Sequence, residues 1–203
     1  MRKLLLLSVV LLCVVGLWAE KEGGKAFVYS GKIGIFRPSS SDLKDAVGSS
    51  WFLFGINAER PINRDTSLVV SLEYTSKSRT SIETEPYTGM PFNVKYTATE
   101  MPILFTWRKA LISGESSILK EDRPQNYPYF GIGAGLYSLK IEGTASALGI
   151  SFSTSDDTWK IGFHILVGAQ FSSNMFAELR WNTIGKWYDT DFGGYSLLVG
   201  IKF

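Results

Sequence analysis

His164 is the single histidine of this chain and its strongest candidate for chemistry. A neutral imidazole can act as a general base or bind a metal ion. Serine catalysis needs such a base within hydrogen-bond reach of the nucleophile. The residues that follow His164 are Ile165 and Leu166, so no serine partner stands next to it in the sequence. One histidine also cannot build a histidine-rich metal site. We therefore expect no catalytic residue, no metal and no cofactor, and we place His164 in a polar network.

Glu178 and Arg180 are the next candidates, because their spacing of two puts both side chains on one face of a strand. A charge buried alone is costly, so charges on an enclosed face must be paired or hydrated. We expect a structural network of ion pairs here. The alternative is a gate or selectivity lining in a narrow pore.

The first 19 residues have the pattern of a cleaved secretory signal. Arg2 and Lys3 precede the apolar run 4–15, and Ala19 precedes a polar stretch, so we expect cleavage after Ala19. A retained membrane anchor is the alternative, but the apolar run is short for a spanning helix. Residues 20–24 then form a short linker, and residues 25–203 form one domain.

Removal of this segment changes what the chain can do. The only cysteine, Cys13, is lost, which leaves no disulfide and no cysteine metal site. Loss of Arg2 and Lys3 leaves basic and acidic side chains equal in number. The mature chain thus lacks the basic bias of a nucleic-acid-binding protein.

Eight segments of the mature chain alternate large apolar and polar or glycine residues, which is typical of β-strands. They are 26–37, 51–60, 67–76, 94–107, 127–141, 158–171, 175–184 and 194–203. Most have about 9–11 residues or more, the length that lets a tilted strand cross a membrane. Strands of globular proteins are usually shorter.

The final strand has its apolar residues at strict spacing two. These residues are Tyr195, Leu197, Val199, Ile201 and Phe203. Leu198 is the one exception to the alternation. A terminal strand of this kind suits a closed barrel, because it removes the free edge of the sheet.

The opposite strand faces carry charges, glycines and few large apolar groups. The charged or ionisable residues on these faces are Lys32, Glu59, Glu73, Glu100, Lys160, His164, Glu178, Arg180 and Lys202. We interpret them as a polar network in the lumen, with the apolar faces in lipid. The pattern predicts an all-β fold, an eight-stranded antiparallel up-and-down transmembrane β-barrel. A soluble barrel of lipocalin type is the alternative, with its apolar face inward.

The strand connections and the aromatic residues agree with a membrane barrel. Long outer connections are expected at 38–50, 77–93, 142–157 and 185–193, and short inner turns at 61–65 and 172–174. The inner connection 108–126 departs from this rule by its length. Aromatic girdles at the membrane interfaces are expected from Tyr74, Trp107, Tyr137, Trp159, Trp181, Trp187 and Tyr195.

Two stretches resemble a known family. Residues 97–105 (TATEMPILF) and 128–137 (PYFGIGAGLY) are similar to successive strands of the outer-membrane protein beta-barrel domain family, and the resemblance extends over 25–203. It implies a bacterial outer-membrane location, contact with membrane lipid and lipopolysaccharide, and assembly machinery that recognises the C-terminal strand. A monomer is expected.

Three functions remain open at this point. The first is a structural or surface-interaction role for a barrel whose lumen is filled by polar side chains. The second is a narrow channel for small or hydrophobic molecules. The third is a lipid-modifying enzyme of the outer membrane, although the His-x-Ser pair of lipid A deacylases is absent at His164.

Overall fold

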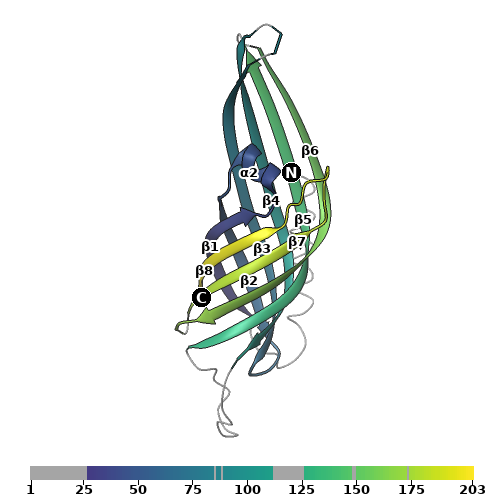
Figure 1. Ribbon diagram of the computed structural model, residues 1–203. Helices are drawn as coiled ribbons and strands as arrows, with labels where there is room; N and C mark the ends of the chain where they lie inside the picture. The colour runs from purple at the N-terminus through teal and green to yellow at the C-terminus, as the bar shows by residue number, and fades with distance from the viewer. Residues whose placement is uncertain (1–26, 85, 88, 112–125, 148–149, 173) are drawn as a thin grey trace.

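The protein is a closed ring of eight strands (Figure 1). The computed structural model describes residues 27–84, 86–87, 89–111, 126–147, 150–172 and 174–203. The elements are β1 (Val28–Pro38), α2 (Ser41–Val47), β2 (Trp51–Pro61), β3 (Thr66–Thr84), β4 (Pro91–Ala110), β5 (Tyr127–Ala147), β6 (Ile150–Gln170), β7 (Met175–Ile184) and β8 (Gly194–Lys202). The predicted signal with its cleavage at Ala19, the linker 20–24 and the first two residues of the 25–203 domain lie outside the described residues.

Every strand pairs antiparallel with its sequence neighbour, and β8 pairs with β1 to close the ring. In this closing ladder Val199 lies opposite Ile33 and Leu197 opposite Ile35, all pointing outward and about half exposed. Leu198, the exception in the apolar alternation, points inward and is fully buried. The predicted all-β, eight-stranded up-and-down barrel is therefore confirmed.

Large apolar side chains cover the exterior of the barrel. Exposed examples are Ile33, Ile35, Phe52, Phe54, Ile56, Phe105, Ile132, Phe163, Ile165, Val167, Leu179, Leu197, Val199 and Ile201. Charged groups such as Glu73 and Arg180 are buried inside. A soluble barrel has the reverse arrangement, so this barrel is of the transmembrane kind.

Within the described ranges, no helix has the length and apolarity that crossing a membrane requires.

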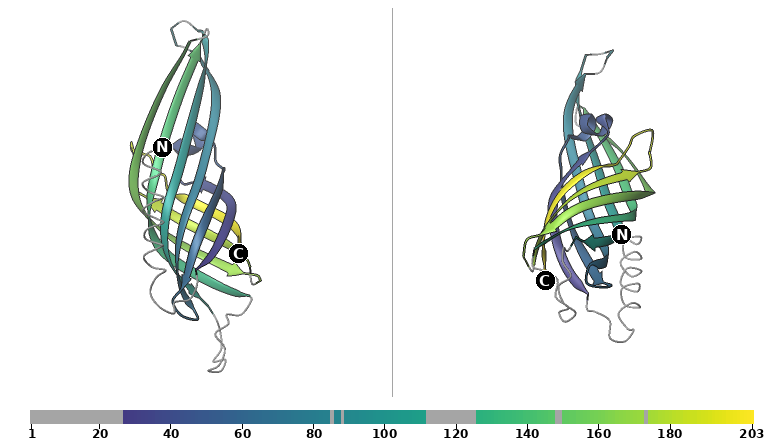
Figure 2. Two further views of the ribbon diagram at one scale, coloured as in Figure 1. Left: turned by 180° about the vertical axis from the view of Figure 1, so that it is seen from behind. Right: turned by 60° about the horizontal axis from the view of Figure 1, so that its bottom comes forward.

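Four neighbouring strands, β3 to β6, extend far beyond the other four on the outer side (Figures 1 and 2). The prediction that 77–93 and 142–157 are loops is therefore wrong for most of their length. Their residues continue the ladders, as in the pairs Lys77 with Ala98 and Glu142 with Ser155. The outward-facing series of apolar residues ends there because this face leaves the hydrocarbon, whereas backbone pairing continues in water.

The other connections are close to expectation. The inner turn 61–65 is tight, and Asn63 Oδ1 accepts a hydrogen bond of 2.7 Å from the Thr66 amide. The outer connection 38–50 holds the short helix α2, which was not predicted and which begins after the N-cap Ser40. In the connection 108–126, β4 continues to Ala110, and residues 112–125 lie outside the described residues.

The predicted aromatic girdle is correct in part. Tyr74, Trp159 and Trp181 point outward near the strand levels expected for an interface and are 38–40% exposed. Tyr137 and Trp187 are buried, so their predicted girdle positions are wrong. Strand parity turns Tyr137 inward, and Trp187 packs with the buried residues at the outer end of the barrel.

Candidate functional site: the filled lumen

Arg108 is the centre of an ion cluster near the inner end of the barrel. Its guanidinium donates hydrogen bonds to Glu178 at 2.5 Å and to Glu59 at 3.2 Å. Lys202 approaches the same Glu59 oxygen at 3.0 Å. Tyr129 donates its hydroxyl to Glu178 at 3.0 Å, and its ring lies under the Arg108 guanidinium. Two cations and two carboxylates from β2, β4, β7 and β8 thus neutralise one another.

Glu73 is the centre of a second cluster, one level further out. Lys32 Nζ lies 2.6 Å from its Oε1 atom. Arg180 donates to both carboxylate oxygens, at 2.5 and 2.6 Å, and approaches Ser196 at 3.4 Å. Lys32, Glu73 and Arg180 are almost fully buried, so the ring is bridged from β1 and β7 to β3. A charge-assisted bidentate pair of this kind is strong and directional.

Glu100 and His164 are buried beside this cluster. His164 Nε2 shares a hydrogen bond of 2.8 Å with the Thr106 hydroxyl. Its ring lies against Gly133, where an added Cβ would come within 2.6 Å of it. Glu100 Oε2 and His164 Nδ1 find no partner among the described residues.

Lys160 is the one member of the predicted lumenal set that lies apart from both clusters. It is on the inward face of β6 opposite Tyr137, but it is only half-buried. In the part of the chain that the structure describes, Lys160 forms no ion pair. The other predicted members occupy the barrel interior, with Lys202 at its inner rim.

The outer half of the interior is apolar, contrary to the prediction of a lumen filled by polar side chains throughout. Its buried residues are Phe36, Leu43, Val47, Trp51, Leu53, Ala98, Leu104, Tyr137, Leu139, Ile184, Trp187, Phe192 and Leu198. Leu43 and Val47 come from helix α2, whereas Trp187 and Phe192 come from the last outer connection. These connections fold their apolar side chains into the mouth of the barrel, which explains the difference.

Several lumenal residues were missed from the sequence. Arg108 was assigned to a connection, although it continues the inward series through Leu104 and Thr106. Tyr129 was not predicted to lie in the lumen, because a tyrosine on a barrel strand usually suggests a membrane interface. The inward series on each strand was the only signal that could have found both residues.

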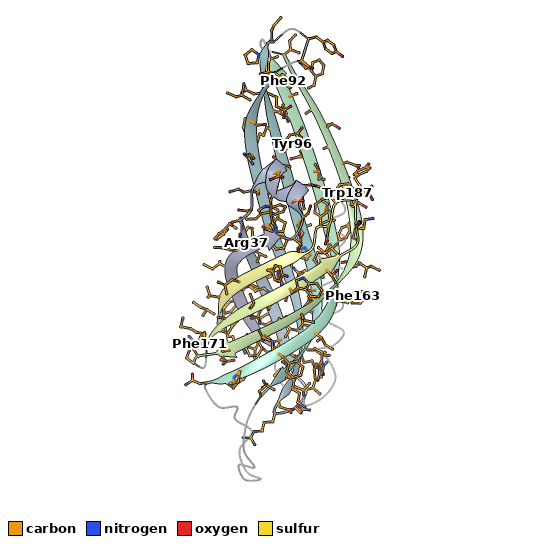
Figure 3. The ribbon with its side chains drawn as sticks, viewed as in Figure 1. Arg37, Phe92, Tyr96, Phe163, Phe171 and Trp187 are labelled. Atoms are coloured by element: carbon orange, nitrogen blue, oxygen red, sulfur yellow. The ribbon has the colours of Figure 1, made fainter. Side chains whose placement is uncertain are left out.

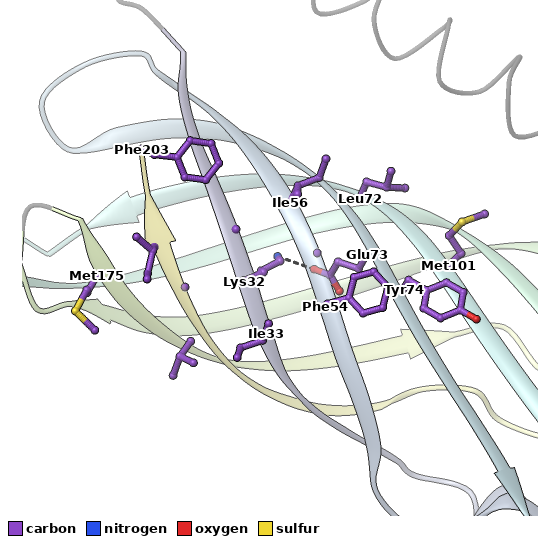
Figure 4. Close-up of a pocket in the computed structure, with 15 residues that line it drawn as sticks. Lys32, Ile33, Phe54, Ile56, Leu72, Glu73, Tyr74, Met101, Met175 and Phe203 are labelled. Carbon is purple, nitrogen blue, oxygen red and sulfur yellow. Dashed lines mark ion pairs between the residues drawn. The ribbon is translucent and has the colours of Figure 1, made fainter.

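The predicted C-terminal residues lie on the exterior. Tyr195, Leu197, Val199 and Ile201 are each more than half exposed, and Phe203 is 81% exposed. The Phe203 amide donates to the Tyr29 carbonyl at 2.9 Å. Phe203 is one of the mainly apolar residues that line a pocket on this surface, and the same view marks the Lys32–Glu73 ion pair (Figure 4).

The arrangement is suited to filling space and joining strands. Among the described residues, no group of three or more histidine, cysteine, aspartate or glutamate side chains could hold a metal ion. The inner cluster balances its own charge, the second joins two cations to Glu73 with Glu100 buried beside them, and the apolar layer lies above both. The fold and its exterior define the class of small eight-stranded outer-membrane β-barrels.

Comparison with solved structures finds the same fold. The chain is similar to the outer membrane protein OprG from Pseudomonas aeruginosa, with a TM-score of 0.50, 11% identity, and coverage of 89% of this chain and 98% of that one. Neisserial surface protein A is 22% identical at a TM-score of 0.49, covering 90% and 100%. The attachment invasion locus protein Ail of Yersinia pestis is 14% identical at 0.48, covering 87% and 97%. No protein-family model and no curated protein sequence matches the chain.

Proposed function

We propose that this chain is an outer-membrane barrel with a structural and surface-interaction role, related to the outer-membrane protein beta-barrel domain family. The observation that carries this proposal is the filled interior. Two buried ion clusters and an apolar layer occupy successive levels between the barrel ends. The interior of an eight-stranded barrel is just wide enough for side chains to fill, so these layers leave solutes no continuous path.

The surface role is supported by the sheet that β3 to β6 form beyond the barrel. Its inner face carries Phe92, Val94 and Tyr96 on β4, beside Ile141 on β5 and Phe152 on β6. Tyr96 and Phe152 are 38% and 74% exposed, and Figure 3 shows Phe92 and Tyr96 on the projecting part. An exposed apolar stripe outside the membrane is a common mark of a protein-binding surface.

Helix α2 covers the base of this inner face and leaves its outer part open. Arg79 at the edge of the sheet donates a hydrogen bond of 2.8 Å to the Asp45 carbonyl in the helix. The open part is the surface on which we place a protein partner. The barrel acts as a monomer, held in lipid and lipopolysaccharide, after insertion through recognition of its C-terminal strand.

The enzyme alternative finds little support in the lumen. Thr106 is the hydroxyl within reach of His164, and both residues are buried. A substrate would have to displace the packed interior to reach this pair. The same filled interior argues against the channel alternative.

Two measurements test the proposal. Planar bilayers containing the refolded protein should show no discrete conductance, and a stable open level would contradict the filled lumen. Bacteria that display the protein should attach to protein-coated plates more than bacteria without it. The double variant Tyr96→Ser, Phe152→Ser should lose this gain, and unchanged attachment would remove the inner face from the proposal.

A further inference from the structure

The outer face of the projecting sheet consists mainly of serine and threonine residues. Four rows of residues cross the four strands on this face. From the membrane outward they are Ser76–Thr99–Lys140–Asp157, Ser78–Thr97–Glu142–Ser155, Thr80–Lys95–Thr144–Ser153 and Ile82–Asn93–Ser146–Ser151. Serine and threonine occupy most positions, and Ile82 is the sole aliphatic residue in these rows. We call these four rows the hydroxyl grid.

The same face changes abruptly at one level of the barrel. One row below the grid, Tyr74 lies on β3 and Trp159 on β6, the two edge strands of this group, with Met101 and Ser138 between them. The row beneath that is wholly aliphatic, with Leu72, Ile103, Leu136 and Ile161. Aromatic residues mark the edge of the hydrocarbon in membrane barrels. The hydroxyl grid therefore begins directly above the hydrocarbon.

The direction of this face decides what can touch it. Strand parity is unbroken from Leu72 to Thr80, so the grid points away from the barrel axis, as the lipid-facing side chains do. Its neighbours are the headgroups of the molecules whose acyl chains cover Leu72 and Ile161. In the outer leaflet of a bacterial outer membrane these headgroups are phosphorylated saccharides.

The chemistry of the grid suits such a neighbour. Hydroxyls both donate and accept hydrogen bonds, as sugars do. Side-chain positions on this face repeat about every 7 Å along a strand and about 4.8 Å between strands. The hydroxyls of Ser78 and Thr97 share a bond of 2.8 Å, and those of Ser76 and Thr99 one of 2.9 Å, so each pair is held in place. Lys95 lies within the grid and is exposed, as a phosphate contact requires.

The inner face of the same strands supplies a contrast. Tyr96 and Phe152 alternate there with grid residues such as Lys95 and Ser153. Both faces are outside the membrane, so contact with water alone does not account for hydroxyls on one and aromatic residues on the other. The two faces are suited to different neighbours.

We propose that this outer face docks against the core saccharide of the surrounding lipopolysaccharide, with Lys95 contacting a saccharide phosphate. The inference rests on the outer-membrane placement of the barrel, and it is independent of the inner face and of the lumen.

The test compares thermal unfolding of the refolded protein in nanodiscs of three compositions: lipopolysaccharide with its core saccharide, lipid A that lacks the core, and phospholipid. The wild type should melt several degrees higher with the complete core than with lipid A alone. The variant Thr80→Val, Thr144→Val, Lys95→Gln should lose this difference. Its melting in lipid A alone should stay at the wild-type value, because valine keeps both shape and strand preference.

A matched control changes the inner face, as Ser81→Ala with Thr154→Val, and should keep the full difference. The single variant Lys95→Gln tests the proposal should the triple variant fold poorly, and it should lose part of the difference. Equal melting of the wild type with and without the core would overturn the proposal. So would a full shift produced by free core saccharide added to lipid A discs, because the site would then bind a soluble sugar.

Discussion

Arg180 and Glu73 form a bidentate ion pair across the barrel, although 107 residues separate them in the chain. Strands β3 and β7 stand four places apart in a ring of eight, on opposite walls. The pair therefore braces the full width of the lumen. Lys32 on β1 shares the same carboxylate, so three walls meet at one buried acid.

Replacing Arg180 with alanine should destabilise the barrel by about 3–5 kcal/mol, because Glu73 would keep only Lys32 as a counter-charge. Urea unfolding in lipid vesicles measures this loss. The triple variant Lys32→Met, Arg180→Met, Glu73→Leu serves as the control and should recover a large part of the stability, because it removes all three charges of the cluster together. A loss below 1 kcal/mol in the single variant would contradict the bracing role.

Replacing Trp51 with alanine should cost about 3–5 kcal/mol, since it empties the centre of the apolar layer. Trp51 is 1% exposed, packs edge-on against Phe36 and donates its indole N–H to the Gly48 carbonyl at 2.8 Å. The adjacent Phe52→Ala is the control. Phe52 faces lipid, and acyl chains can fill its place, so its loss should be much smaller. Equal losses at the two positions would show that the outer layer is not packed.

Two glycine substitutions separate the interior from the exterior. Gly133→Ala should cost about 1–3 kcal/mol, because the new Cβ would overlap the His164 ring and the Phe105 carbonyl. Gly31→Ala should be tolerated, since no atom lies within 4 Å of its Cβ position. Refolding yield and urea unfolding report both. A harmful Gly31→Ala together with a neutral Gly133→Ala would reverse the assigned directions.

Tyr188 should titrate above the ordinary tyrosine range. Its hydroxyl donates a hydrogen bond of 2.7 Å to Asp156, and this bond raises the pKa of Tyr188. Because the folded pKa is raised, the contact stabilises fully below the ordinary tyrosine pKa of about 10 and is lost as pH rises through the higher folded value. Ultraviolet titration of tyrosinate, compared with Tyr188→Phe, identifies this group. Asp156→Asn should return its titration to the ordinary range, and no change on that substitution would exclude the contact.

Phe203→Ala should lower the amount of barrel assembled in the outer membrane of living cells but leave refolding in detergent unchanged. Phe203 is almost fully exposed and adds little to folded packing, so its effect should arise during assembly. Phe171→Ala, another exposed aromatic at the inner end, is the control and should assemble normally. Normal cellular assembly of Phe203→Ala would remove this residue from the assembly signal.

The hydroxyl grid lies on a part of the strands that the sequence pattern did not predict. The alternation from Leu68 to Tyr74 predicted a strand because one neighbour was lipid and the other the lumen. Beyond Ser76 both faces of the strand lie outside the membrane, and its residues are mainly polar, which suggested a loop. The strand continues because each backbone group still finds a partner on β4, which a single segment cannot reveal.

The lumen shows a second limit. Period two determined that Glu73, Glu178 and Arg180 point inward, but it did not determine that Arg180 pairs with Glu73 or that Glu178 pairs with Arg108. Partners across a barrel depend on the stagger between strands, which is a property of ring closure.

By itself, the sequence determined the number of strands, the lipid-facing side of each strand and the closing role of the final strand, because these follow from local side-chain alternation. Only the tertiary structure decided which charges neutralise one another, that the outer half of the lumen is apolar, and that four strands rise beyond the membrane. Those features arise from contacts between segments far apart in the chain. Such contacts exist only once the ring has closed.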